Sequence, residues 1–332
     1  NARTDALAEI GTQRLEDRIQ VAAAKLLNDP ADAVRLIDRD GLDPYDSKVD
    51  DKIADLTLLD RTGCDDMSTW LKLEYPIAHV RKLADSVDQS RLRIDWRELD
   101  RRPNEIGRHL LAPIDKQEVW GCGIMYAQSR DAHMHGTGQG ATFYDQVYDS
   151  DRPMIFFKAT PHRVVGPNDA IRIRSDSVWT VPEPELTLLL TPDLRIVGYT
   201  CGNDVSSRDI EGENPLYRPQ AKTYVGCCAL GPVITLLEQP TDVEDLEMRL
   251  VVIRDGATVI QGDATTKRMA RAVDDVIQFV GRDNAYPDGL FLLTGAGIIV
   301  PQDFSLEPDD VVEITIEGIG TLRNPVERRS LS

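Results

Sequence analysis

Hydrophobic residues recur at roughly helical spacing in the first part of the chain. An amphipathic helix is predicted from Asn1 to a break at Asp29-Pro30, and the pattern resumes over Ala31–Ile37. A further amphipathic stretch is predicted over Asp66–Leu83. We therefore expect a helical N-terminal region covering residues 1–111. The apolar positions of its first helix are Leu7, Ile10, Leu15, Ile19, Val21, Ala22, Leu26 and Leu27.

From residue 119 onward, beyond a domain boundary that we place at residues 111 and 112, the pattern changes to short β-branched segments separated by Gly, Pro and Asp turns, which predicts strands. One helix is predicted among them, over Thr266–Val280, because its apolar residues repeat at helical spacing. The fold class expected for residues 112–332 is therefore α+β, a β-rich domain rather than a doubly wound parallel sheet. The predicted strands include Ile171–Ile173, Leu186–Leu190, Ile196–Tyr199, Val233–Leu236, Met248–Ile253, Ile298–Val300 and Val311–Ile316.

The composition of the 332 residues is 41% hydrophobic, which suffices for one large domain or two with a buried core. The most hydrophobic stretches, such as Leu186–Leu190 and Ile298–Val300, are far shorter than the about 18 residues of a membrane-spanning helix. Residues 1–17 are polar and acidic and lack the layout of a signal peptide. We therefore expect a soluble, cytoplasmic protein with no membrane partner.

The charge balance is acidic, with 56 Asp and Glu against 38 Lys and Arg and a net charge of −18. No cluster of Lys and Arg is present to neutralise phosphates, so nucleic acid is not an expected partner. The five cysteines lack C-x-x-C spacing. We expect reduced thiols rather than disulfides or a zinc site.

Several short motifs are too incomplete to indicate a cofactor. Gly121-Cys-Gly123 and Gly136–Gly140 lack the third glycine of a dinucleotide-binding loop. His133-x-His135 could bind a transition metal, but no third soft ligand accompanies it, and a mobile glycine-rich loop is favoured. Lys158 and His162 have no context that assigns them a role.

Three carboxylates are predicted to converge. Glu183 and Glu185 are two residues apart on a predicted strand and therefore share a face. The turn over Thr191–Arg195 returns the next strand, so that Asp204 lies at the same end of the pair. Like charges beside an apolar strand need protons or a bound cation to neutralise them. An all-oxygen set suits Mg²⁺, with Mn²⁺ and Ca²⁺ as alternatives, and a solvated edge strand is the competing interpretation.

Lys222 lies between turn residues and an apolar run. A lysine there could bind a substrate carboxylate, act as an acid or base, or form a Schiff base, and it could equally be an ordinary snorkelling side chain. Arg208-Asp209 could be a local ion pair or an anion clamp.

Four phrases in order resemble the fumarylacetoacetate hydrolase superfamily: Val181–Leu186, Gly202–Asp209, Gln220–Lys222 and Leu292–Gly295. The resemblance covers about residues 112–327 and implies a β-rich mixed-sheet catalytic domain that forms a homo-oligomer. It also implies that Glu183, Glu185 and Asp204 bind Mg²⁺ and that Lys222 is the active-site lysine. By their place in these phrases, Arg208, Gln220 and Thr294 are implied to orient the substrate.

Further phrases resemble the branch of the superfamily that dehydrates 2-keto-3-deoxy sugar acids. The implied activity is that of a Mg²⁺-dependent hydro-lyase acting on a small-molecule 2-oxo acid through a metal-stabilised enolate. The expected reaction, in pentose catabolism, converts 2-keto-3-deoxy-D-pentonate to 2,5-dioxopentanoate. These phrases are Phe156–Thr160, Arg174–Ser177, Glu213–Tyr217 and Gly226–Pro232.

Two positions depart from the pattern of the superfamily. Ser129 stands where hydrolytic members carry a catalytic His, which points toward a lyase and makes Ser129 a candidate substrate contact. Met154 stands where the dehydratases tend to carry an acidic residue, so another group handles that proton or the substrate differs. The alternatives are a metal-dependent C–C hydrolase, decarboxylase or isomerase of another 2-oxo acid, a Schiff-base lyase using Lys222, and an acidic non-catalytic binding protein.

Overall fold

The computed structural model describes residues 66–86, 99–103, 109–126, 147, 150–237 and 240–328. The chain divides into two compact units, Asn1–Trp70 and Leu71–Ser332. The helices predicted over residues 1–37 lie outside the described residues, as do Ser129 and the His133-x-His135 motif. The remaining elements belong to the second unit, apart from a helix that begins at residue 67.

The amphipathic stretch predicted over Asp66–Leu83 forms two helices rather than one. They are α4 (Met67–Leu71) and α5 (Pro76–Ser86). Pro76 opens the second helix, a position where the missing N–H of proline costs no hydrogen bond. The hydrophobic periodicity therefore continues across the break between the two helices, and Pro76 explains why a new helix begins there.

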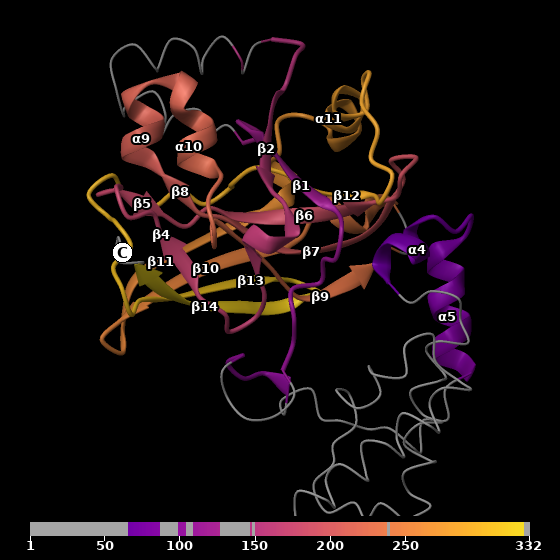
Figure 1. Ribbon diagram of the computed structural model, residues 1–332, viewed down its shortest axis with the longest axis horizontal. Coiled ribbons are helices and arrows are strands. Elements are labelled where there is room, and N and C mark those ends of the chain that lie inside the picture. The colour runs from indigo at the N-terminus through magenta and orange to yellow at the C-terminus, as the bar shows by residue number, and fades with distance from the viewer. Residues whose placement is uncertain are drawn as a thin grey trace, which may run out of the picture. The chain divides into compact units, whose positions relative to one another are not determined.

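A seven-stranded mixed sheet lies at the centre of the domain (Figure 1). Its spatial order is β2-β1-β12-β6-β7-β9-β3, with β1 parallel to β12, β3 parallel to β9 and the other neighbours antiparallel. The strands are β1 (Glu118–Gly123), β2 (Met154–Ala159), β3 (Val164–Val165), β6 (Pro184–Leu190), β7 (Ile196–Asp204), β9 (Cys228–Leu236) and β12 (Leu290–Leu293).

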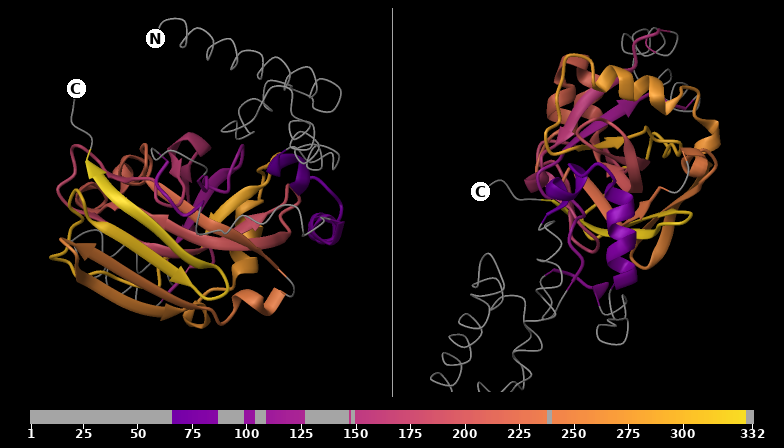
Figure 2. Two further views of the ribbon diagram at one scale, coloured as in Figure 1. Left: turned by 90° about the horizontal axis from the view of Figure 1, so that it is seen from below. Right: turned by 90° about the vertical axis from the view of Figure 1, so that its right-hand side faces the viewer.

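A five-stranded sheet in the order β11-β10-β13-β14-β4 forms a second layer, in which only the β14–β4 pair is parallel. A third sheet is the short pair β5-β8. Figure 2 shows the orange and yellow strands of the five-stranded sheet lying beside one another as one layer. The strands are β4 (Ile171–Ile173), β5 (Thr180–Val181), β8 (Ser206–Ser207), β10 (Glu247–Arg254), β11 (Ala257–Thr265), β13 (Val311–Ile316) and β14 (Gly320–Arg328).

The core lies between the two layers, where β7 and β9 contact β13 and β14. Every residue of β6 is buried, because neighbouring strands cover both of its edges and its two faces are packed. On β13 buried and partly buried residues alternate, the pattern of a strand with one face on the core. The predicted α+β, β-rich fold class is confirmed.

The helices of the second unit are short, and Figure 1 shows α9 and α10 side by side and α11 apart from them. The predicted helix over Thr266–Val280 was too long, because a 3-10 turn at Thr266–Arg268 precedes an extended break before α11. The predicted strand Ile298–Val300 was wrong, because this segment is irregular. Ile298 and Val300 are buried, so their apolar character reflects burial in the core and not pairing with a neighbouring strand. The helices are α9 (Arg208–Glu213), α10 (Arg218–Lys222), α11 (Val273–Val280) and the 3-10 turns η1 (Pro161–Arg163), η2 (Pro215–Tyr217), η3 (Pro240–Val243) and η4 (Thr266–Arg268).

Candidate metal centre and active site

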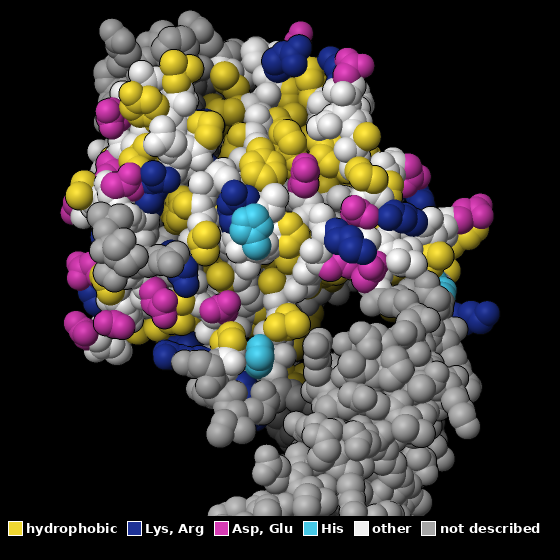
Figure 3. All heavy atoms as spheres, viewed as in Figure 1, with side chains coloured by type: hydrophobic (Ala, Val, Ile, Leu, Met, Phe, Trp, Pro, Cys, Tyr) yellow, Lys and Arg dark blue, Asp and Glu magenta, His cyan; other side chains and the backbone are white. Residues whose placement is uncertain are grey.

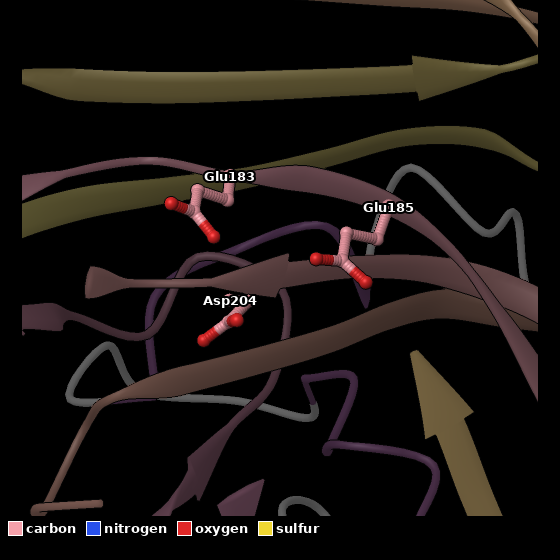
Figure 4. A group of neighbouring side chains, drawn as sticks. All are labelled: Glu183, Glu185 and Asp204. Atoms are coloured by element: carbon pink, nitrogen blue, oxygen red, sulfur yellow. The ribbon is translucent and has the colours of Figure 1, made fainter. Parts of the chain in front are cut away.

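The register of the β6–β7 hairpin assembles the three predicted carboxylates. Glu185 lies opposite Gly202, and the amide of Asp204 donates a hydrogen bond to the carbonyl oxygen of Glu183 at 2.9 Å. The amide of Glu183 in turn donates to Oδ1 of Asn203 at 3.2 Å. One ligand atom from each of the three carboxylates lies within 4.8 Å of the others, and Figure 4 shows the carboxylates facing one another. The predicted convergence is present.

All three carboxylates are buried, with Glu185 exposing 3% of its surface and Asp204 only 1%. Burial raises the pKa of Glu185 well above its usual range, and the negative charges of Asp204 and Glu183 raise it further. The amide of Gly295, which donates to Oε2 of Glu185 at 2.6 Å, acts in the opposite direction. A solvated edge strand is excluded, because β6 lies between β12 and β7.

Three cations contact this triad of carboxylates. Nζ of Lys222 is 2.7 Å from both Oε2 of Glu183 and Oδ2 of Asp204. Nζ of Lys158 is 2.5 Å from Oδ1 of Asp204, and Nη2 of Arg208 is 3.2 Å from Oε1 of Glu183. The two lysines come from elements far apart in sequence, β2 and α10.

Lys222 is a buried ammonium group and not a snorkelling side chain, since its side chain is 4% exposed. Burial by itself lowers the pKa of Lys222, but the carboxylates of Asp204 and Glu183 outweigh burial and raise it. The same balance, burial against Asp204, raises the pKa of Lys158. Both lysines are therefore held in the charged form in this arrangement.

A cavity of about 30 Å³ lies over the triad. Helices α9 and α10 provide one of its walls with Glu211 and Arg218, whose Nη2 and Oε1 atoms are 2.9 Å apart. The guanidinium of Arg218 stands 5.4 Å from the ring centre of Phe156 on β2. The cavity therefore has a carboxylate floor and a polar, aromatic rim. Its other lining residues are Cys122, Gly123, Ile124, Met154, Arg208, Lys222, Gly295, Ala296 and Ile299.

Of the other predicted substrate contacts Arg208, Gln220 and Thr294, only Arg208 lines the cavity. Arg208 lines the cavity, and its Nε is buried with no hydrogen-bond partner among the residues that the structure describes. Gln220 is exposed and lines a neighbouring pocket of about 350 Å³, which shares Phe156 and Arg218 with the cavity. The hydroxyl of Thr294 donates to the carbonyl oxygen of Leu186 at 2.8 Å and does not line the cavity.

Sequence reasoning did not assign Lys158, Glu211 or Arg218 to the site. For Lys158 a signal existed, because Met154, Phe156 and Lys158 alternate on one strand and share a face. For Glu211 and Arg218 no periodic signal was available, since each lies on a helix of five or six residues.

The residues present fit a hard divalent cation. The site offers three carboxylates, the donors that Mg²⁺ prefers, at a place where burial disfavours their negative charge. The surface is different: on the face in Figure 3 acidic and basic side chains are interspersed. No helix in the described part of the chain has the length and apolar character needed to cross a membrane.

Comparison with known proteins gives consistent matches. The chain is 48% identical over 220 residues to the 2-dehydro-3-deoxy-D-arabinonate dehydratase of Saccharolobus solfataricus, covering 65% of this chain and 74% of that protein. It is 47% identical over 221 residues to a probable 2-keto-3-deoxyxylonate dehydratase of Haloferax volcanii, covering 67% of this chain and 76% of the relative.

A solved structure of 2-keto-3-deoxy-D-arabinonate dehydratase complexed with magnesium and 2,5-dioxopentanoate is also similar. It superposes with a TM-score of 0.66 at 41% identity, covering 77% of this chain and 90% of that one. Residues 126–327 match the family described as Fumarylacetoacetate (FAA) hydrolase C-terminal. The chain, with its carboxylate triad on the β6–β7 hairpin, therefore belongs to the fumarylacetoacetate hydrolase family.

Proposed function

We propose that this protein is a Mg²⁺-dependent hydro-lyase that removes water from a 2-keto-3-deoxy sugar acid, converting 2-keto-3-deoxy-D-pentonate to 2,5-dioxopentanoate. The observation that carries the proposal is the buried triad of Glu183, Glu185 and Asp204 in contact with Lys222. Relatives with 47–48% identity bear the names of such dehydratases. A solved relative holds both the metal and the product.

The triad would hold the metal through its carboxylate oxygens. When bound, Mg²⁺ supplies positive charge that stabilises negative charge on the carbonyl oxygen of a 2-oxo acid and so acidifies the C3 proton. Arg208 is suited to bind the substrate carboxylate, because its buried Nε has no hydrogen-bond partner in the described structure. Burial of these groups excludes water from the reacting carbons.

Two proton transfers are required. Glu211 lines the cavity, and we assign its carboxylate to accept the C3 proton in place of the acidic residue that Met154 replaces. The ammonium of Lys222 donates a proton to the departing C4 hydroxyl, which leaves as water. The electrons of the C3–H bond form the C3–C4 double bond. A proton then leaves C5 and one is added at C3, which moves the double bond to C4–C5 and gives an enol, and transfer of the enol hydroxyl proton to C4 converts the terminal alcohol into the aldehyde.

The ion pairs of Lys222 bear on two earlier alternatives. An ammonium that is ion-paired with two carboxylates, as Lys222 is with Glu183 and Asp204, is a poor base and a poor nucleophile, so removal of the C3 proton by Lys222 and Schiff-base formation are both disfavoured. Its two ion pairs with Glu183 and Asp204 also restrict its reach. Lys222 is therefore assigned as the acid.

A second candidate function is hydrolysis, decarboxylation or isomerisation of another 2-oxo acid at the same metal site. Met154 favours it, because this apolar residue lines the cavity where the dehydratases tend to carry an acid. The triad serves any reaction that passes through negative charge on the carbonyl oxygen. Identification of the product separates the two functions.

The test is an assay of the full chain with 2-keto-3-deoxy-D-pentonate, with Mg²⁺ or with EDTA, following 2,5-dioxopentanoate by mass spectrometry. The expected result is metal-dependent product that disappears in a Glu183→Ala/Glu185→Ala variant and persists in Glu313→Ala, which removes a carboxylate from β13. Mg²⁺ binding without product would show that 2-keto-3-deoxy-D-pentonate is not the substrate, and other 2-oxo acids would then be assayed. An acidic binding protein would show neither metal binding nor turnover.

Several wider properties are part of the same proposal. Residues 112–332 form the catalytic domain, and residues 1–111 a helical region before it. The four described cysteines are free and buried, which fits a cytoplasmic enzyme of pentose catabolism. The homo-oligomer implied by the resemblance is tested by light scattering of the purified chain.

A further inference from the structure

Lys158 is fully buried on β2, at 0% exposure, with its Nζ 2.5 Å from Oδ1 of Asp204. The same Nζ donates a hydrogen bond to the carbonyl oxygen of Val205 at 2.9 Å. Met154 and Phe156 precede it at alternate positions and line the cavity, whereas Lys158 does not. Lys158 therefore contacts the site only through the carboxylate of Asp204 and does not reach the cavity in which a substrate would bind.

Asp204 is consequently held by ammonium groups from both sides. Its Oδ2 is 2.7 Å from Nζ of Lys222, which lines the cavity, while Oδ1 faces Lys158 behind it. Each ammonium offsets part of the negative charge that Asp204 would present to a further cation. A bound divalent ion thus competes with Lys158 for the charge of Asp204, although the ion and the lysine approach from different directions.

The two lysines differ in what they can do. Lys222 is open to the cavity and can exchange its partners when substrate or metal enters. Lys158 is fully buried on β2, and its carboxylate and carbonyl partners are Asp204, the last residue of β7, and Val205, which follows it. Without Lys158, the buried triad would retain one ammonium fewer in the metal-free protein, which is costly for carboxylates out of water.

We propose that Lys158 is a positioning residue that sets the metal affinity of the triad: it holds Asp204 and stabilises the metal-free site, and it weakens the binding of divalent cations. This inference rests on the metal site of the proposed function. It gives the triad an internal cation that keeps the site folded between metal-binding events.

The experiment titrates Mg²⁺ alone into the metal-free full chain by calorimetry and measures thermal unfolding with and without Mg²⁺. In Lys158→Met we expect the metal-free protein to melt at a lower temperature and Mg²⁺ to bind at least about tenfold more tightly. Saturating Mg²⁺ should then restore most of the lost melting temperature. A merely structural lysine would give unchanged or weaker Mg²⁺ binding, and that result overturns the proposal.

Two further variants keep the test decisive. Lys158→Arg retains the cation, so its Mg²⁺ affinity should stay within about threefold of the unchanged protein, and a tenfold change in it contradicts the proposal. Lys267→Met is the matched control, because it removes a lysine whose partner, Asp245, is on the surface. Its Mg²⁺ affinity should not change. If Lys158→Met does not fold, Lys158→Gln, which removes the charge but keeps a polar end, takes its place with the same expected tightening of Mg²⁺ binding.

Failure of the inference and failure of the proposed function give different results. Absence of Mg²⁺ binding by the unchanged protein would remove the metal site and the proposed function with it. Normal Mg²⁺ binding and dehydratase turnover, with no tightening in Lys158→Met, would remove only the role assigned to Lys158.

Discussion

The main-chain amide of Asp204 donates a hydrogen bond to the carbonyl oxygen of Glu183, with an N···O distance of 2.9 Å. This bond continues the β6–β7 ladder by one pair beyond Pro184 and Asn203. Both side chains are thereby placed at the same end of the hairpin, where Glu185 also points. The geometry of the metal site is therefore a direct consequence of strand register, and a slip by one residue would turn the carboxylates to the opposite face.

Replacing Glu185 with Gln should stabilise the metal-free protein while abolishing metal binding. At a pH above the raised pKa of Glu185, the substitution removes a buried negative charge beside two others and keeps an oxygen to accept the hydrogen bond from Gly295. We expect the free energy of unfolding of the metal-free chain to rise by about 1 kcal/mol. Loss of a residue that only supports a metal ligand lowers metal affinity by up to about 100-fold. Because Glu185 is itself a ligand of the proposed site, the fall in Mg²⁺ affinity should be larger than this. Denaturant unfolding and calorimetry measure the two quantities, and a less stable variant would contradict the electrostatic account.

Mg²⁺ affinity should rise with pH. Because the pKa of Glu185 is raised in the metal-free site, its carboxylate binds a proton at any pH below that pKa, and this proton has to leave when the metal binds. The dissociation constant should fall up to about tenfold for each pH unit and level off above the raised pKa. Calorimetry in buffers of different ionisation enthalpy measures the released proton directly, and no proton release would refute the prediction.

The stability of the metal-free protein should fall as pH rises through the same range. The folded pKa of Glu185 lies above its unfolded value of about 4.3, so the folded state binds more protons between these two values and loses stability as pH increases between them. The increase in melting temperature caused by Mg²⁺ should therefore grow with pH. In Glu185→Gln the fall should be smaller, which makes this variant the control.

Lys222 should act as an acid and not as an imine-forming nucleophile. Lys222→Met should lower kcat by about 100-fold to 10,000-fold, the range expected for loss of a general acid. Borohydride added with substrate should leave no covalent adduct on the unchanged chain, because the raised pKa keeps the ammonium charged. Intact-mass spectrometry detects such an adduct, and activity that survives EDTA together with an adduct would reinstate the Schiff-base alternative.

Gly202 should not tolerate a side chain. A Cβ on this residue would collide with the Thr187 side chain and approach Cδ2 of Leu293 to 2.5 Å. Both neighbours are fully buried, so Gly202→Ala should cost about 1–3 kcal/mol in the free energy of unfolding. Since Gly202 pairs with Glu185, Mg²⁺ affinity should also fall. Gly256→Ala is the comparison for the metal site: no atom lies within 4 Å there, so its cost in stability reports the positive φ alone, and its Mg²⁺ affinity should not change.

The amino-acid sequence by itself determined the local part of this site. Side chains two apart share a face of a strand, and a short turn must return the chain beside itself, so Glu183, Glu185 and Asp204 were predicted together from spacing alone. The family phrases then indicated which ion the carboxylates bind. The prediction of a strand at Ile298–Val300 was wrong because apolar residues indicate burial, and burial alone does not distinguish a paired strand from an irregular segment.

Only the tertiary structure decided whether the triad is buried and what neutralises it. β6 lies in the interior of the sheet because β12, about a hundred residues later in the chain, pairs along its other edge. Lys158 and Lys222 reach Asp204 from β2 and α10 through sheet order and helix placement, which no local spacing encodes. Burial and charge are properties of the assembled neighbours, and they set both the raised pKa of Glu185 and the affinity of the site for a metal ion.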